Sequence, residues 1–187
     1  AVLSDAEPSM SLYYLLSSLP MLTFESAPAL TVDAFLEVCR EQLSRSDADA
    51  VAALAHGSPS SHPLVAEWRD KEAILRNAAA RERARAAGAN AERWLRPTAG
   101  CDTLVESLVE DAFQEPDPLK KERALDRARW WIAEELQGPD PLTVRAVFSY
   151  AVKLAILSRW GALTPEAGRE VFDALCRVSV PLSAETD

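Results

Sequence analysis

The sequence predicts an all-α fold, a multi-helix bundle with one long helix and one nearly all-apolar central helix. Apolar side chains recur at steps of three and four residues along almost the whole chain, which is the period of an α-helix and not of a strand. Proline and glycine interrupt that period at a few places and so mark helix ends. With 187 residues, 48% of them hydrophobic, the chain is long enough to bury a core.

We expect three parts along the chain. A flexible N-terminal extension occupies residues 1–10, a single helical domain occupies residues 11–180, and a polar tail occupies residues 181–187. Within the domain, 11–57 and 64–180 are candidate lobes, because a Ser/Pro-rich stretch between them breaks the helical period.

Four helices are predicted in the first half of the chain, at residues 12–16, 31–43, 47–55 and 64–87. The first apolar block is short, so a strand is kept as the alternative there. Thr31 and Ser46 are the expected N-caps of the next two helices. The fourth helix is about 36 Å long at 1.5 Å per residue, and Gly88 is expected to close it.

Four more helices are predicted in the second half, at residues 102–112, 118–137, 142–160 and 165–180. Asp102 and Asp117 are their clearest N-cap candidates. The helix at 142–160 is apolar almost all round and therefore belongs at the centre of the bundle. The last helix is expected to turn one apolar face to the core, made of Val171, Phe172, Leu175 and Val178.

Composition limits the kind of partner. A net charge of −9 and a pI near 4.8 argue against nucleic acid and against an anionic membrane, since both attract a concentrated positive field. No apolar run approaches the ~20 residues of a membrane span. We therefore expect a cytoplasmic protein without direct membrane insertion, whose partners are other proteins.

The cysteines indicate a reducing compartment. Cys39, Cys101 and Cys176 lie far apart and lack the paired spacing of disulfide frameworks or thiolate metal sites. We expect each to be a small buried apolar side chain, with a reactive thiol as the alternative.

Motifs that carry catalysis are missing. The sequence contains no glycine-rich phosphate loop, HExxH, GxSxG or CxxC, and its six glycines leave little scope for phosphate cradles that need φ > 0. We predict no cofactor, no metal and no catalytic residue. His56 and His62 share a loop and form one metal candidate, but we prefer a helix end at His56 and an exposed turn before proline at His62.

Five carboxylates gather within twelve residues: Glu106, Glu110, Asp111, Glu115 and Asp117. A hard-cation site or an acid/base pair would use such groups, but either needs carboxylates that converge from several elements. A solvated acidic face is the preferred interpretation.

A positive segment lies within this acidic chain. Residues 67–96 carry eight bases and five acids, and the candidate partner-binding side chains are Arg76, Arg81, Arg83, Arg85, Arg93 and Arg96. They suit an acidic protein surface or a nucleic acid backbone. The alternative, which we prefer, is that they pair with the acidic lobes of this same chain, on either side of the positive segment.

A single polar line crosses the apolar central helix at Arg145, Ser149 and Lys153. A buried ammonium without a partner is very unfavourable, so Lys153 is expected to pair with an acid from a neighbouring helix or to reach solvent. A catalytic lysine is the less favoured alternative.

Several stretches together resemble a small family of functionally uncharacterised bacterial proteins encoded beside the subunits of V-type ATPases. These stretches span most of residues 11–175: Tyr13 to Pro20 with Phe24, Asp33 to Cys39, Trp68-Arg69, Asp117-Pro118-Leu119 with Glu122, and Tyr150 to Trp160 followed by Gly168, Val171 and Phe172. The helix pattern is also similar to the C (or d) subunit of that ATPase, which joins its central stalk to the membrane ring. The chain is much shorter than that subunit.

The resemblance implies a non-catalytic helical subunit, or an assembly or accessory factor, of a rotary V-type ATPase, held at the inner membrane through the complex. It supplies no catalytic residue. A stand-alone adaptor that binds an acidic partner through residues 76–96 is the alternative. An enzyme that uses Lys153 or the acidic cluster is the third hypothesis.

Overall fold

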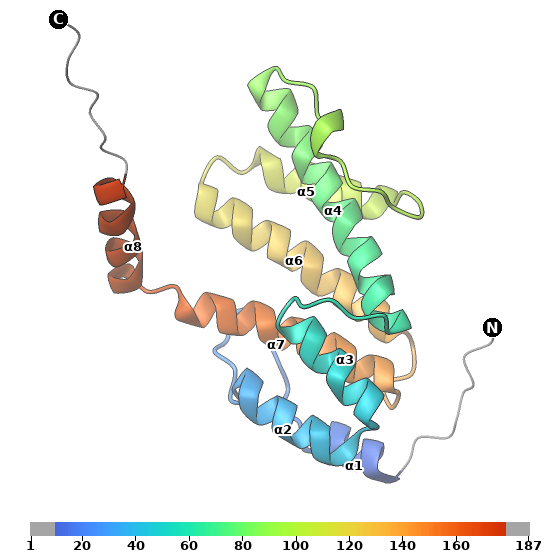
Figure 1. Ribbon diagram of the computed structural model, residues 1–187. Helices are drawn as coiled ribbons and strands as arrows, with labels where there is room; N and C mark the ends of the chain where they lie inside the picture. The colour runs from blue at the N-terminus through green and yellow to red at the C-terminus, as the bar shows by residue number, and fades with distance from the viewer. Residues whose placement is uncertain (1–9, 179–187) are drawn as a thin grey trace, which may run out of the picture.

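The computed structural model describes residues 10–178, which form eight α-helices and one short 3-10 helix and contain no strand (Figure 1). The all-α prediction is confirmed. The α-helices are α1 (Met10–Ser18), α2 (Val32–Gln42), α3 (Arg45–Ala55), α4 (Pro63–Ala87), α5 (Thr103–Gln114), α6 (Pro118–Gln137), α7 (Val144–Ala162) and α8 (Pro165–Val178), and the 3-10 helix η1 is Glu92–Trp94.

The first apolar block is helical, so the strand alternative is wrong there. Residues 1–9 of the expected extension, and residues 179–187 with the expected polar tail, lie outside the described residues.

Several helices begin at the capping side chains that the sequence predicts, and α4 ends at the predicted glycine. Thr31, Asp102 and Asp117 each accept a hydrogen bond from a backbone N–H of the first helical turn that follows. Gly88 closes α4 in the left-handed region, with φ at 62°. The prediction for Ser46 is wrong. Ser44 caps α3 instead, because its Oγ accepts from the Asp47 N–H at 3.1 Å and also donates to the Asp47 carboxylate at 2.7 Å.

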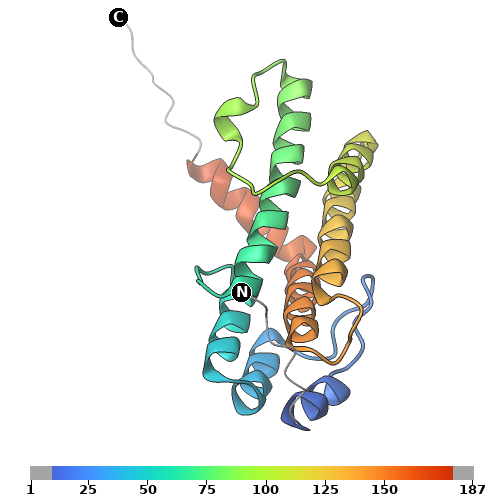
Figure 2. The same cartoon turned by 90° about the vertical axis from the view of Figure 1, so that its right-hand side faces the viewer.

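Helix α7 lies in the middle of the molecule, as predicted, and packs against α6 on one side and against α1, α2 and α3 on the other (Figures 1 and 2). One apolar cluster joins the N-terminal helices to α7 and to the start of α4. A second cluster joins α4, α5 and α6. Trp68 of α4 packs against both clusters and so connects them.

Helix α8 departs from the prediction. Every described side chain from Pro165 to Arg177 is exposed, including Val171, Phe172 and Leu175, which were expected to face the core. The side chain of Val178 is outside the described residues. Figure 1 shows α8 leaving the end of α7 and standing away from the bundle. The axes of the two helices differ in direction by 75°. The amphipathic pattern identified the apolar face correctly, but not what it packs against.

The cysteines also differ from the prediction. Cys39 is buried in the first apolar cluster, as expected. Cys101 and Cys176 are exposed, so the expectation of three buried thiols is wrong for these two. Cys101 lies in the loop before α5, and Cys176 lies on the exposed helix α8, where no core is at hand to bury them.

Within residues 10–178 no single helix is long and apolar enough to cross a membrane. Helices α7 and α8 taken together, across their bend, have the length and composition to do so.

Candidate functional site

Four of the six candidate arginines pair with acids of this chain, but only Arg81 and Arg83 pair with the acidic lobe outside the positive segment, as the preferred interpretation requires. Arg76 contacts Glu72 at 2.7 Å, Arg81 contacts Glu106 at 3.1 Å, Arg83 contacts Glu122 at 3.8 Å, and Arg85 contacts Glu82 at 2.9 Å. Arg93 lies over the ring of Trp94, with its guanidinium carbon 5.0 Å from the ring centroid. The backbone N–H and C=O of Arg96 bond to the side chain of Asn77, both at 2.8 Å.

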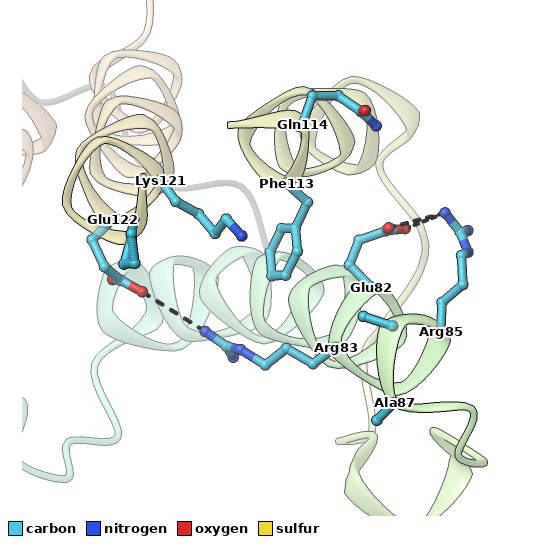
Figure 3. Close-up of a pocket in the computed structure, with 10 residues that line it drawn as sticks. Glu82, Arg83, Arg85, Ala87, Phe113, Gln114, Lys121 and Glu122 are labelled. Carbon is cyan, nitrogen blue, oxygen red and sulfur yellow. Dashed lines mark hydrogen bonds and ion pairs between the residues drawn. The ribbon is translucent and has the colours of Figure 1, made fainter. Parts of the chain in front are cut away.

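The middle of this segment borders a cleft between the ends of α4 and α5 and the start of α6 (Figure 3). The cleft has a volume of about 660 Å³. Phe113 points into it from α5, and two cations flank its ring. The Arg83 guanidinium carbon lies 5.7 Å from the ring centroid, and Lys121 Nζ lies 5.0 Å from it. We call this cleft, with Arg83, Phe113, Lys121 and Glu122, the tip cleft.

The lining of the tip cleft combines charged and apolar side chains. Its lining holds arginines, a lysine, glutamates, a glutamine, alanines, a proline and a phenylalanine, and no serine, cysteine or histidine. Arg83 and Glu122 are both well exposed and 3.8 Å apart, so solvent weakens their attraction and a partner's carboxylate can compete for the arginine. A cation over an aromatic face adds about 0.5–1 kcal/mol at exposed sites.

The acidic cluster does not converge. Glu106 pairs with Arg81, and Asp117 caps α6. Among the described residues, no group of three or more His, Cys, Asp or Glu side chains is placed to hold a metal ion.

The two histidines have separate positions in the fold. His56 ends α3, as expected. His62 is not in an exposed turn, so that part of the prediction is wrong. Its ring stacks on Phe148 with centroids 5.0 Å apart, its Nδ1 accepts from the Leu64 N–H, and its Nε2 lies 3.2 Å from Asp47. A neutral ring therefore carries its proton on Nε2, and His62 serves as the N-cap of α4.

Along the polar line of α7, Arg145 and Lys153 each pair with an acid, whereas Ser149 between them has no hydrogen-bond partner among the described residues. Arg145 donates to the Leu136 carbonyl at 2.7 Å and to Glu67 at 2.6 Å. Lys153 Nζ lies 3.3 Å from a Glu134 carboxylate oxygen, so it pairs with an acid from a neighbouring helix. Ser149 is fully buried, and its Oγ has no hydrogen-bond partner in the described part of the chain.

Ser149 and Lys153 line a second cleft, which we call the α1–α7 groove. It is about 510 Å³ in volume and lies between α1, the segment that follows α1, the loop before α7, and the first half of α7. Its other walls are mostly apolar and include Tyr13, Leu16, Leu19, Met21, Leu142 and Tyr150. Sequence reasoning found the polar line but missed the groove. No sequence signal marks the groove, because its walls come from segments far apart in the chain, such as Tyr13, Met21 and Leu142.

A buried ion cluster around Asp126 was also missed. The Asp126 side chain is 2% exposed, accepts from Arg129 at 2.8 Å and from the Trp160 indole N–H at 2.7 Å, and also pairs with Arg159. Burial lowers the pKa of Arg129, but the carboxylates of Glu72 and Asp126 outweigh burial, and the net shift of the pKa is upward. Through Arg159 and Trp160, the cluster joins the last turn of α7 to Asp126 of α6, shortly before α8 begins. No local pattern in the sequence marks Asp126, because its neighbours on the helix face are the charged residues Glu122, Arg123 and Arg129.

Comparison with known proteins adds one match. A family model described as a protein of unknown function (DUF2764) matches residues 103–178, which is less than half of the chain. The matched stretch runs from α5 to α8 and contains the Asp126 cluster and the polar line of α7. No curated protein and no solved structure matches the chain significantly.

Proposed function

We propose that this chain is a non-catalytic helical subunit, or an assembly or accessory factor, of a rotary V-type ATPase. In this proposal it acts on the cytoplasmic side of the membrane and binds other subunits of the complex. The identity of the partner rests on the sequence resemblance stated above, including the similarity to the C (d) subunit.

The tip cleft is the observation that supports a binding role most directly. It presents an aromatic ring between two cations, Arg83 and Lys121. Leu119, next to the cleft-lining Pro118, is 58% exposed and extends the apolar part of this surface. Such a mixture of an aromatic anchor, arginine and exposed leucine is typical of the surfaces through which proteins bind one another.

Native co-purification tests the proposal. The ATPase is purified from its own membranes under mild detergent, and this chain is expected among its components. Reversal of both flanking charges, Arg83→Glu with Lys121→Glu, should lower the recovered amount at least about tenfold, which corresponds to about 1.4 kcal/mol of binding free energy. Arg45→Glu is the matched control, because Arg45 is almost fully exposed and belongs to α3. An intact ATPase that never contains the chain would refute the proposal.

The second candidate is a stand-alone adaptor for an acidic protein, and the exposed pair of Arg83 and Glu122 supports it, because an incoming carboxylate could replace Glu122. Charge reversal at Arg81, Arg83 and Arg85 should abolish capture of that partner while helical circular dichroism is unchanged. Capture of a partner other than the ATPase, lost in this triple variant, would favour the adaptor. Capture that persists in the triple variant counts against it.

For the third candidate, an enzyme that uses Lys153 or the acidic cluster, the favourable observation is that Lys153 lines the α1–α7 groove. Lys153 is engaged by Glu134, and its ammonium also lies 5.2 Å from the centroid of the Trp130 ring. We therefore propose a protein without catalytic residues.

A further inference from the structure

A third cleft lies between the end of α3, the first half of α4 and the segment that follows η1, and we call it the arginine cleft. Its volume is about 340 Å³. Its floor is apolar, with Leu54 and Val65 buried and Trp68 partly buried. Three arginines and one glutamate complete the main part of the lining: Arg69, Arg76, Arg96 and Glu72. The lining therefore carries an excess of positive charge, although the whole chain has a net charge of −9.

The fold brings the three arginines to this cleft from two segments. Arg69 and Arg76 are seven residues apart on α4, so they share one side of the helix and are about 10 Å apart along its axis. Arg96 is held by Asn77, whose side chain is buried. The Asn77 side-chain carbonyl accepts from the Arg96 N–H, and its amide donates to the Arg96 carbonyl, both at 2.8 Å. The segment after η1 therefore lies beside the turn of α4 that carries Arg76 (Figure 2).

Most of the guanidinium donors in this cleft have no partner within the described part of the chain. An arginine has five N–H donors. One donor of Arg69 is used by the Ser58 carbonyl. Arg76 donates through its Nε to Glu72 at 2.7 Å. Among the described residues, the Arg96 guanidinium has no hydrogen-bond or ion-pair partner, although its backbone is fixed.

Glu72 does not cancel the positive charge of the arginine cleft. Its carboxylate lies 2.7 Å from Arg76 Nε and 3.2 Å from Arg129 Nε, so two arginines share it. In the tip cleft, by contrast, two of the bases each pair with a separate glutamate of the lining. A planar guanidinium donates parallel N–H bonds to a carboxylate or a phosphate. The arginine cleft therefore suits an oxyanion.

We infer that the arginine cleft binds a small organic anion. Its carboxylate or phosphate group is held by the guanidinium groups of the rim, and its apolar or aromatic body lies on the floor that contains Trp68. The volume of about 340 Å³ falls within the range of about 300–1,000 Å³ that small-molecule sites occupy. A protein partner would need a much larger surface, about 800 Å² on each side. The site is separate from the tip cleft, and the inference does not rest on the proposed ATPase role.

Isothermal titration calorimetry of the full chain with phenyl phosphate tests the inference. This probe combines a phosphate group with an aromatic body. One molecule is expected to bind per chain, at least about tenfold more tightly than inorganic phosphate, which lacks the ring, or phenol, which lacks the anion. Sodium chloride should weaken the binding, because the arginines are exposed. Absence of binding, or equal affinity for inorganic phosphate, would overturn the inference.

Substitutions of single arginines locate the bound molecule. Arg69→Gln and Arg96→Gln should each weaken the binding of phenyl phosphate at least about tenfold. Arg93→Gln is the matched control, because Arg93 is exposed only three residues before Arg96, and it lies over the ring of Trp94 and does not line the cleft. Circular dichroism establishes that each variant folds. If Arg83→Gln in the tip cleft weakened binding and Arg96→Gln did not, the assignment would be wrong.

Nuclear magnetic resonance of the arginine side chains identifies the contact directly. The Nε–Hε signals of Arg69, Arg76 and Arg96 are assigned from their loss in the corresponding glutamine variants. Addition of phenyl phosphate should shift these three signals and leave that of Arg93 unchanged. Shifts that miss Arg96, or that include Arg93 to the same extent, would refute binding in the arginine cleft.

Discussion

Replacement of Asp126 by asparagine tests the buried ion cluster. Asparagine has almost the same shape, so the change removes the charge and leaves no cavity. One carboxylate oxygen is lost, and the new NH₂ group faces the donors of Arg159 and Trp160. The last turn of α7 then loses its contacts with the Asp126 carboxylate, while Arg129 keeps its contacts with Glu72 at 3.2 Å and 3.3 Å.

The expected loss follows from the burial of each partner. Removal of one partner from a fully buried ion pair destabilises by about 3–5 kcal/mol. Here Asp126 is buried, but Arg159 is 48% exposed and can recover water, and Arg129 retains a second carboxylate. We therefore expect Asp126→Asn to lower the free energy of unfolding by about 2–3 kcal/mol, between the full loss and the value of a single hydrogen bond to a charged group.

Urea unfolding followed by far-ultraviolet circular dichroism measures the change, with tryptophan fluorescence as a second probe because Trp160 contacts Asp126 directly. Coincident transitions from the two probes justify a two-state free energy. Asp111→Asn is the matched control, since Asp111 is exposed on α5 and should change stability by less than about 0.5 kcal/mol. A loss below about 1 kcal/mol in Asp126→Asn would show that the cluster does not stabilise the α6–α7 packing.

Three further predictions concern single side chains. Lys71 lies 2.6 Å from Asp102 and lowers the pKa of the Asp102 carboxyl in the folded protein. The pair therefore contributes its full stability above the pKa of an unfolded aspartate, near 3.9. This contribution is lost as the pH falls through the lower pKa of the folded protein. Asp102→Asn, which keeps the N-cap, should therefore lower stability by about 0.5–1 kcal/mol at pH 7 and by progressively less below pH 4, and a difference that does not vary with pH would contradict this. Burial raises the pKa of Cys39 to about 12, so a thiol reagent at pH 8 should label Cys101 and Cys176 rapidly and Cys39 only on unfolding, and three fast thiols would refute it. Tyr150→Phe removes the hydrogen bond from the hydroxyl to the Pro20 carbonyl at 3.0 Å and should lower the unfolding free energy by about 1 kcal/mol in the same urea assay, and no loss would mean that this bond contributes nothing.

Local chemistry made much of the fold predictable. Thr31, Asp102 and Asp117 each precede an apolar-periodic run, and each has an oxygen that can accept from the first helical turn. Ser46 was the wrong choice over Ser44 because both serines precede the same run. Their spacing from Asp47 decides between them, since only Ser44 stands three residues before it, where its Oγ can reach the Asp47 N–H.

Tertiary contacts between distant segments were not predictable in the same way. Nothing near His62 in the sequence indicates that Phe148 stacks on its ring, and nothing near Asp126 indicates that Arg159 and Trp160 come to it from α7. Both cases need two segments far apart in the chain to meet. A single sequence reports local period and charge, and it does not report which faces come together.

The polar line of α7 shows where local pattern and tertiary environment diverge. Arg145, Ser149 and Lys153 are spaced by four residues and so share one side of the helix. Neighbouring helices supply carboxylates to the two ends, Glu67 to Arg145 and Glu134 to Lys153, whereas Ser149 at the centre is fully buried and has no hydrogen-bond partner among the described residues. The helical period predicts that the three residues align, but the partners depend on the packing.

The same reasoning explains why α8 was predicted to face the core. An amphipathic period indicates that a helix has an apolar face that is more stable when covered. It does not indicate whether the covering residues belong to the same chain or to another. In α8 the apolar face carries Val171 and Phe172 and points away from the bundle, so the pattern was interpreted correctly and only the location of the helix was wrong.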